Sequence, residues 1–173
     1  MKHFLLIASC FAILISAFEI AEDFDPQKFK GKWWEQARSK NAFFELGEYV
    51  EANYKLRKEG GFNIDQASIQ PNGMRRRVKA IADPVGDSPN HFLFWYPDSW
   101  FSRWTKADFR ILATDYKNYA IIFSLNRVLG MDWKFAWILT RKRVVDNKCM
   151  DKLFDEVAQR TGFQKYQMHR TLQ

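Results

Sequence analysis

Apolar and polar residues alternate along most of this chain, and glycine, proline and asparagine residues interrupt the alternation. A period of two places successive side chains on opposite faces, which is typical of strands that bury one face. The pattern predicts eight strands, over residues 33–39, 48–57, 62–70, 74–82, 91–96, 109–114, 119–124 and 134–141. Their connections are mostly of hairpin length, which favours an antiparallel meander or barrel. A turn is expected at 24–30 and a longer loop at 83–90.

The periodicity changes after the eighth strand. Apolar residues then recur at helical spacing, at Met150, Leu153, Phe154, Val157 and Ala158. Asp146 can cap a helix that begins near Asn147, and Thr161-Gly162 can end it. A short last strand is expected at 163–168. The predicted fold class is therefore all-β, an eight-stranded antiparallel up-and-down barrel with one C-terminal α-helix packed on its outside. Such a barrel has room inside for side chains or one small ligand.

Two adjacent tryptophans, Trp33 and Trp34, stand at the start of the first strand. Because neighbouring side chains on a strand point to opposite faces, one of the two rings is expected to face inward. Gly31 precedes the pair and lets another piece of backbone come close. We expect the inward ring to close the floor of the barrel.

The N-terminus has the three-part layout of a secretory signal. A short basic start that contains Lys2 is followed by an apolar run over 4–18, and Ile15-Ser16-Ala17 offers a small-residue cleavage site. This predicts a signal peptide at 1–17, a domain at 18–173 and a secreted or extracytoplasmic protein. An uncleaved anchor, which would make the protein membrane-associated, and a lipoprotein signal at Cys10 are the alternatives.

The charge and the side-chain chemistry narrow the function classes. The chain of 173 residues has a formal net charge of +7, and its basic residues are scattered except for clusters at 75–79 and 141–143. Both clusters alternate with strand residues, so a solvated sheet face is favoured over a nucleic-acid site. The residues form no metal-ligand spacing and no nucleophile or phosphate-loop motif, so no metal, cofactor or catalytic residue is expected. Glu35 is weighed as an acid near the cavity floor, although such a carboxylate is more often bonded to backbone or solvated.

Three separated stretches resemble the conserved blocks of the lipocalin family. They are Gly31-x-Trp33-Trp34-Glu35-x-Ala37-Arg38, Thr114-Asp115-Tyr116-x-Asn118-Tyr119-Ala120 and Trp137-Ile138-Leu139-Thr140-Arg141. Glu51-Ala52-Asn53-Tyr54 is similar to the second strand in the branch that contains apolipoprotein D and the bacterial lipocalin. The likeness runs from about residue 25 to 163 and falls on the expected elements.

The resemblance implies a structural role for Gly31, Trp33, Thr114, Asp115, Tyr116 and Arg141. In such a barrel the inward tryptophan of the first strand lies under the arginine of the last one, so we expect a cation–π pair of Trp33 with Arg141. The chain departs from apolipoprotein D in lacking its disulfide cysteines, because the predicted mature chain keeps only Cys149.

The resemblance also implies an open barrel end that four loops surround. These loops carry many apolar residues, and the predicted mouth consists of Phe43, Phe44, Trp95, Trp100, Phe101 and Trp104. One interpretation is an apolar entrance that admits a lipid or touches a membrane. The other is that rings of the loop after 96 fold back as a plug or pack on a neighbouring subunit.

Four residues are expected to contact a ligand. Strand parity places Trp137 and Leu139 on the same inward face as Arg141. Tyr54 and Gln66 follow from the resemblance to apolipoprotein D. Each of the four could instead be ordinary wall packing.

The leading functional hypothesis is an extracytoplasmic lipocalin, not an enzyme, that binds or transports a small hydrophobic ligand. Fatty acids, lysophospholipids, sterols and pigments are the candidates. One alternative is a structural subunit of a membrane-associated assembly, which would contact a membrane surface or a protein partner through the aromatic mouth. A lipid-modifying enzyme that uses Glu35 is a third, less favoured hypothesis. Nucleic acid is not expected as a partner.

Overall fold

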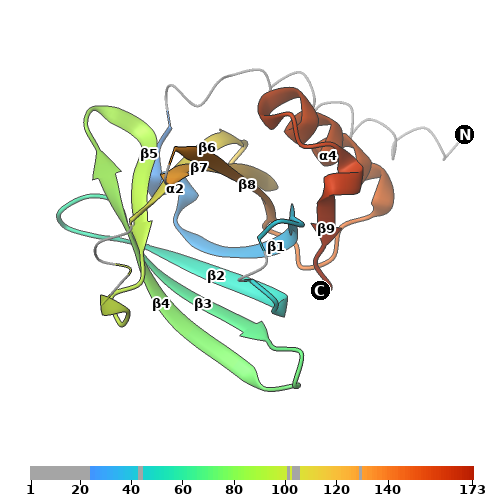
Figure 1. Cartoon of the computed structure of the whole chain (residues 1–173), viewed down its shortest axis with the longest axis horizontal. Helices are drawn as coiled ribbons and strands as arrows, with labels where there is room; N and C mark the ends of the chain where they lie inside the picture. Colours follow the sequence, from blue (N-terminus) through green and yellow to red (C-terminus); the bar gives the residue numbers. More distant parts are fainter. Residues whose placement is uncertain (1–23, 43–44, 101, 103–105, 129) are drawn as a thin grey trace, which may run out of the picture.

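The computed structural model describes residues 24–42, 45–100, 102, 106–128 and 130–173. Its barrel strands are β1 (Gly31–Ser39), β2 (Glu48–Leu56), β3 (Phe62–Ile69), β4 (Arg75–Val85), β5 (Ser88–Trp95), β6 (Ala107–Thr114), β7 (Tyr119–Val128) and β8 (Met131–Thr140). Each strand pairs antiparallel with the next, and β1 pairs with both β2 and β8, so the sheet closes on itself (Figure 1). The predicted eight-stranded barrel is confirmed.

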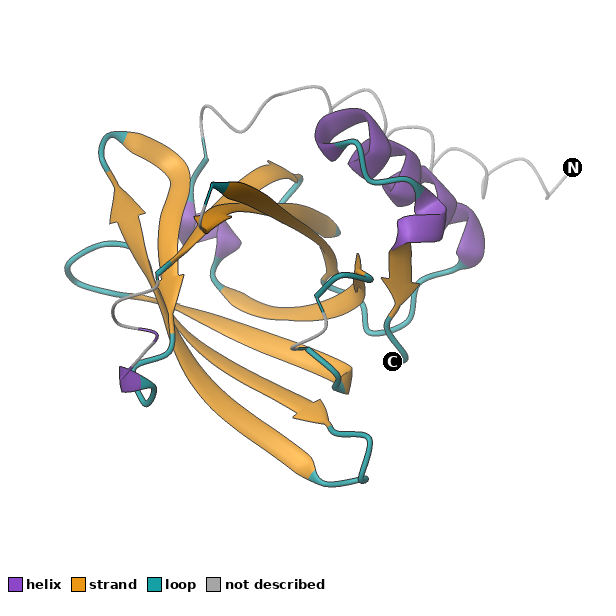
Figure 2. Ribbon diagram, in the orientation of Figure 1, coloured by secondary structure: helices purple, strands orange, loops and turns teal. Residues whose placement is uncertain are grey.

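The remaining elements lie at the two ends of the described chain. They are α2 (Pro26–Phe29), α4 (Asn147–Thr161), the 3-10 helix η2 (Lys165–Gln167) and β9 (Met168–Arg170). β9 adds to the upper end of β1, and Figure 2 shows α4 packed outside the barrel. In the residues that the structure describes, no helix has the length and apolarity needed to cross a membrane.

Several predicted boundaries were wrong. The loop expected at 83–90 is a tight hairpin, because β4 continues through Pro84 and the register shifts between Pro84 and Val85. Such a bulge accommodates a proline that cannot donate to the ladder. The turn expected at 24–30 contains α2, which Asp25 caps by accepting a hydrogen bond from the N–H of Gln27. The last strand begins at Met168, after η2, instead of spanning 163–168.

The closed end of the barrel is built around Trp33, which is fully buried. The Arg141 guanidinium lies 3.7 Å from the centroid of the Trp33 ring, which confirms the predicted pair, and Phe29 stacks on the ring at 4.9 Å. Arg141 also donates to the backbone carbonyls of Lys28, Phe29, Lys30, Lys32 and Tyr116. Gly31 adopts φ 101°, and a Cβ there would lie 3.2 Å from the guanidinium. A glycine therefore lets Arg141 approach the backbone.

The turn between β6 and β7 presents one of these carbonyls. The carboxylate of Asp115 accepts hydrogen bonds from three successive backbone N–H groups, of Lys117, Asn118 and Tyr119. Thr114 accepts from the N–H of Tyr116 and donates to the carbonyl of Tyr119. These bonds hold Tyr116 at φ 62°, where its carbonyl meets Arg141. The motif residues of the resemblance thus meet at the floor.

Helix α4 covers the outer face of the closing strands. Its buried residues Met150, Phe154 and Val157 form one apolar cluster with residues of β6, β7 and β8. Asp146 caps the helix by accepting from the N–H of Cys149, and Gly162 ends it at φ 81°. The predicted helix is confirmed.

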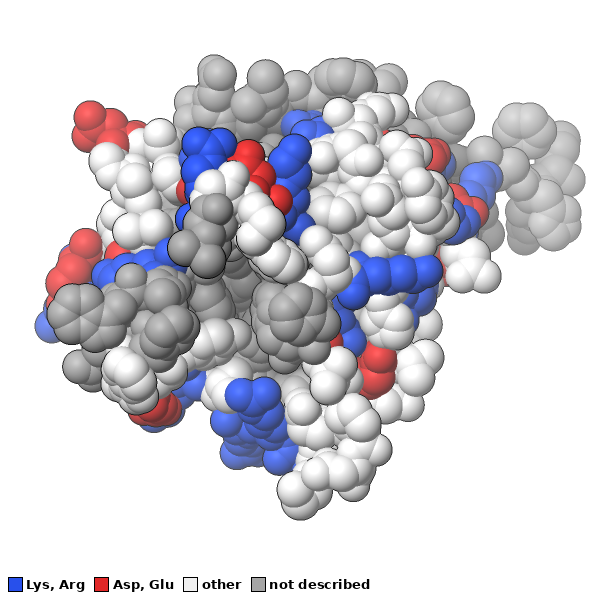
Figure 3. Space-filling view, viewed as in Figure 1, with Lys and Arg blue, Asp and Glu red and all other residues white. Residues whose placement is uncertain are grey.

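Basic residues do not gather in one patch on the face of the described chain that Figure 3 shows. Figure 3 shows lysines and arginines in several separate groups, with acidic residues between them. On the outer face of β2, β3 and β4, Glu51 binds both Lys32 at 2.9 Å and Arg75 at 3.0 Å, and Lys55 binds Asp65 at 2.6 Å. This is the solvated sheet face that the alternation indicates.

Candidate ligand-binding cavity

The lower half of the barrel is filled with aromatic rings. Phe29 of α2 lies 5.1 Å from Tyr54 of β2, and Phe62 of β3 lies 5.6 Å from Tyr54 and 5.5 Å from Phe92 of β5, between ring centroids. Phe24 packs on the same group. The interior cavity lies above these rings, and Tyr54 belongs to both.

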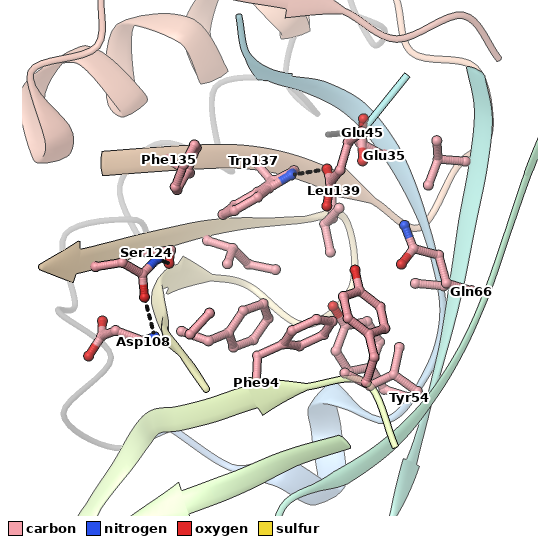
Figure 4. A pocket seen from close by; sticks show the side chains of 18 residues that line it. Glu35, Glu45, Tyr54, Gln66, Phe94, Asp108, Ser124, Phe135, Trp137 and Leu139 are labelled. Carbon is pink, nitrogen blue, oxygen red and sulfur yellow. Dashed lines mark hydrogen bonds between the residues drawn. The ribbon is translucent and has the colours of Figure 1, made fainter. Parts of the chain in front are cut away.

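This cavity has a volume of about 150 Å³ (Figure 4). Its wall is mostly apolar, and the apolar side chains include Val50, Ile64, Phe94, Phe109, Ile122 and Phe135. A few polar groups, from Glu35, Glu45, Gln66, Tyr96 and Ser124, are distributed among them. An apolar wall with a few polar groups is the usual composition of a small-molecule site.

The four predicted ligand contacts all line this cavity. They come from β2, β3 and β8, and they are Tyr54, Gln66, Trp137 and Leu139. Tyr54 is only 5% exposed and also packs on the aromatic floor, so it forms the base of the cavity. Burial raises the pKa of its phenol, and the nearby carboxylates act in the same direction. Contact of the four side chains with a ligand stays a prediction.

Trp137 is held by an acid at the top of the cavity. Its Nε1–H donates to Oε2 of Glu45 at 2.8 Å (Figure 4). Glu45 lies in the segment between β1 and β2, which approaches β3 at Gly47, where a Cβ would meet the Ser68 side chain at 2.6 Å. Burial raises the pKa of Glu45 to about 7, the charge of Glu35 adds to this, and the Trp137 hydrogen bond and Arg38 oppose it.

Glu35 is buried and belongs to a second polar group. Its Oε1 accepts from Arg38 at 2.7 Å and from the Thr171 hydroxyl at 2.6 Å. Arg38 also lies 3.7 Å from Glu48, which binds His169 at 2.7 Å. Glu35 therefore lies above the floor and is bonded to side chains, whereas the sequence placed it near the floor with backbone or solvent as its partners.

The predicted mouth is only partly described. Phe43, Phe44, Phe101 and Trp104 lie outside the described residues. Trp100 is 77% exposed in the segment between β5 and β6. Trp95 is the last residue of β5 and does not line the cavity, whereas its neighbours Phe94 and Tyr96 do, so its place at the mouth stays a prediction. Its Nε1–H donates to Asp83 at 2.8 Å, and Lys106 lies 5.0 Å from its ring.

A family model described as a lipocalin-like domain matches residues 24–173. The chain belongs to the lipocalin family. This lipocalin is 30% identical over 139 residues to apolipoprotein D of Macaca fascicularis, covering 78% of this chain and 69% of that protein. It is 32% identical over 123 residues to apolipoprotein D of Mus musculus, covering 70% and 63%. It is 27% identical over 142 residues to the outer membrane lipoprotein Blc of Vibrio cholerae, covering 82% and 78%. These relatives place it in the branch of apolipoprotein D and the bacterial lipocalin, and it spans 63–69% of the two apolipoprotein D chains.

Solved structures share the fold of this lipocalin. Insecticyanin of the tobacco hornworm Manduca sexta matches with a TM-score of 0.71 and 20% identity, over 87% of this chain and 81% of that one. Lobster apocrustacyanin A1 matches with a TM-score of 0.70 and 21% identity, over 85% and 78%. At these identities the likeness shows the fold alone.

Sequence reasoning missed several residues that line the cavity of this lipocalin. Phe94 and Tyr96 could have been predicted from the sequence, because they share the inward face of the fifth strand with Phe92. Glu45 could not, because it lies outside the periodic segments. A glycine two residues later was the one local sign that the segment packs closely.

Proposed function

We propose that this lipocalin binds a small hydrophobic ligand in the cavity beneath the mouth of its barrel. The apolar cavity between the filled floor and the open end is the observation that carries the proposal. Burial of apolar ligand surface contributes roughly 25 cal/mol per Å², from which the entropy lost on binding must be subtracted.

The size of the cavity favours a slender ligand. A cavity of about 150 Å³ is comparable with an engineered apolar cavity that holds one benzene, and pockets for drug-sized ligands measure about 300–1,000 Å³. A second hollow of about 200 Å³ adjoins it at the mouth and shares Glu35, Glu45, Val50, Gln66 and Tyr96. The pair fits one hydrocarbon chain with its polar end above, so among the candidates a single-chain lipid is favoured over a sterol or pigment.

Binding is favoured over catalysis by the state of the candidate acid. Oε1 of Glu35 already accepts hydrogen bonds from Arg38 and Thr171. We further propose an extracytoplasmic location. The apolar run over 4–18 and the likeness to a protein named as an outer membrane lipoprotein support it.

The rim supports contact with a lipid surface during loading. Among the described residues, large apolar side chains are exposed at or beside all four connections of the open end, and these are Leu46, Met74, Trp100 and Met131, the first residue of β8. Their exposed fractions run from 56% to 77%. A ring of apolar side chains around an entrance is suited to a bilayer surface.

Titration with dodecanol, followed by isothermal calorimetry, tests the binding proposal. The parent should bind, and Val50→Phe should weaken binding at least about tenfold by filling the cavity. Leu93→Phe, on β5 but outside the cavity lining, is the matched control and should bind like the parent. Native mass spectrometry of protein purified from its source should show a co-purified lipid. A parent protein that neither binds dodecanol nor carries lipid would refute the proposal.

A further inference from the structure

The cavity wall carries carboxylates without cations. Glu35 and Glu45 line it, and none of the described lining residues is a lysine or arginine. Asp108 also borders the cavity, but its carboxylate binds His91 at 2.6 Å and Arg110 at 3.1 Å, and Figure 4 shows it turned away from the centre. Two acids therefore face the space where a ligand would lie.

Glu45 is the acid whose charge is least compensated. Arg38, the cation whose charge acts on Glu45, is shared between Glu35 at 2.7 Å and Glu48 at 3.7 Å. No ion pair among the described residues includes Glu45, whose hydrogen-bond partner is the Trp137 indole. A carboxylate offers about four acceptor positions, so it retains acceptor capacity beyond that one bond.

We propose that Glu45 makes the cavity selective for the charge of the ligand's polar end. The cavity takes single-chain ligands whose polar end donates hydrogen bonds and carries no negative charge, and it disfavours carboxylates. This inference rests on the proposed binding function and narrows its ligand class to long-chain alcohols and amines. A hydroxyl or ammonium can donate to Glu45, whereas a fatty-acid carboxylate would bring a second negative charge into a poorly solvated site.

The titration of Glu45 agrees with this geometry. Its pKa is raised to about 7 by burial and by Glu35, so near neutral pH it gains or loses a proton at little cost. A bound anion would raise this pKa further and a bound ammonium would lower it. Several charged or polar groups face this acid: Glu35 and Arg38 on β1, Tyr54 on β2, Arg76 on β4, Trp137 on β8 and Tyr96 after β5. His169 on β9 acts indirectly, because it binds Glu48, which also lies beside Arg38. Carboxylate binding should therefore weaken as pH rises through about 7, and ammonium binding should strengthen.

Arg76 supports the competing arrangement. Arg76 is exposed and lines the second hollow, at the mouth, together with Gln66 and Ser68. It does not line the cavity of about 150 Å³. If Arg76 held a carboxylate at the rim, fatty acids would bind well. Their hydrocarbon chain would then lie in the cavity, and their carboxylate would lie beyond Glu45, toward solvent. The two arrangements predict opposite orders of affinity.

Three probes with the same chain distinguish them: laurate, dodecanol and dodecylamine, each below its micellar concentration. At about pH 8, where Glu45 is ionised, the parent should bind dodecylamine and dodecanol at least about tenfold more tightly than laurate. Glu45→Gln keeps an acceptor for Trp137 and should bring the three affinities within about threefold of one another. Glu59→Gln, which removes the same charge from an exposed turn at the closed end, should preserve the parent order.

The results separate the two proposals. Laurate binding as tightly as the amine, or an unchanged order in Glu45→Gln, would overturn the charge selection and leave the binding function standing. Loss of a preferred laurate complex in Arg76→Gln would assign the head-group site to the rim. Binding of none of the three probes would refute the proposed function and the inference together.

Discussion

Replacement of Trp33 should destabilise the barrel and leave the ligand site intact. Trp33 is fully buried under Arg141, stacks on Phe29 and donates from Nε1 to the Phe29 carbonyl at 2.9 Å. It does not line the cavity. Truncation of a buried tryptophan to alanine costs 3–5 kcal/mol, and the lost hydrogen bond and cation–π contact place Trp33→Ala at about 4 kcal/mol. Domains of this kind have a total stability of about 5–15 kcal/mol, so Trp33→Ala removes a large share of it.

Trp34 provides the matched control. It is the next residue, lies on the outer face, and contacts Lys32 at 5.1 Å and Arg143 at 5.3 Å from its ring centroid. Trp34→Ala should cost about 1 kcal/mol, because both contacts are solvated. Urea unfolding followed by far-ultraviolet circular dichroism measures both changes without depending on tryptophan emission.

Trp33→Phe keeps the site testable if Trp33→Ala does not fold. It should cost about 2 kcal/mol and bind dodecanol within about threefold of the parent, because Trp33 does not line the cavity. Equal stabilities of Trp33→Ala and Trp34→Ala would refute this account of the floor. So would a stable Trp33→Phe that has lost ligand binding.

Three further predictions concern Arg141 at the floor, Glu45 near the mouth, and the rim. Arg141→Lys keeps the positive charge but loses the planar guanidinium that donates to several carbonyls. It should lower the unfolding free energy, measured by urea titration, by about 2–3 kcal/mol. An unchanged urea midpoint would show that the guanidinium is dispensable. Glu45 has a pKa of about 7 in the folded protein, against 4.5 for a freely solvated glutamate, so its ionisation opposes folding. Its favourable contribution to stability is therefore complete below about pH 4.5 and is lost as pH rises through 7. Glu45→Gln should accordingly gain stability over the parent across that window, on the order of 2 kcal/mol by pH 8, and a pH-independent difference would contradict the assignment. The double variant Leu46→Ser/Met74→Ser should co-sediment several-fold less with phosphatidylcholine vesicles than the parent. The control is Tyr166→Ser, because Tyr166 is 73% exposed but lies next to α4, away from the rim, and this variant should co-sediment like the parent. Equal losses in the two variants would argue against membrane contact through the rim.

The sequence predicted the elements whose physics is local or periodic. The eight strands follow from alternation, and α4 follows from its apolar spacing with Asp146 and Gly162 as caps. The pairing of Trp33 with Arg141 required a resemblance to a known family, because 108 positions along the chain separate them and no local pattern joins them. The hairpin at 83–90 was missed because a proline was taken as a strand end, and tertiary pairing with a register shift absorbed it.

The candidate site was predictable in its wall but not in its depth or its chemistry. Strand parity placed Trp137 and Leu139 on the inner face, where they line the cavity. The depth of the cavity depends on how Phe29 of a short helix packs against Phe62 and Tyr54 of two strands, which is a packing outcome without a sequence period. The position of Glu45 depends on the segment between β1 and β2, which has no sequence period.

The two ends of the barrel divide stability from selection, and β8 connects them. Arg141 follows its last residue at the floor, and Trp137, on the same face four residues earlier, meets Glu45 near the mouth. Since Trp33 and Arg141 close the floor through hydrogen bonds and ring contacts and do not line the cavity, their substitutions should change the unfolding free energy alone. Since Glu45 is partly buried and forms no ion pair among the described residues, its substitution should change which ligands bind and make the fold more stable above pH 7. This division therefore requires that Glu45→Gln both gains stability and loses the discrimination between charged and uncharged ligands. Substitution of a surface acid or of a floor residue would not produce both effects.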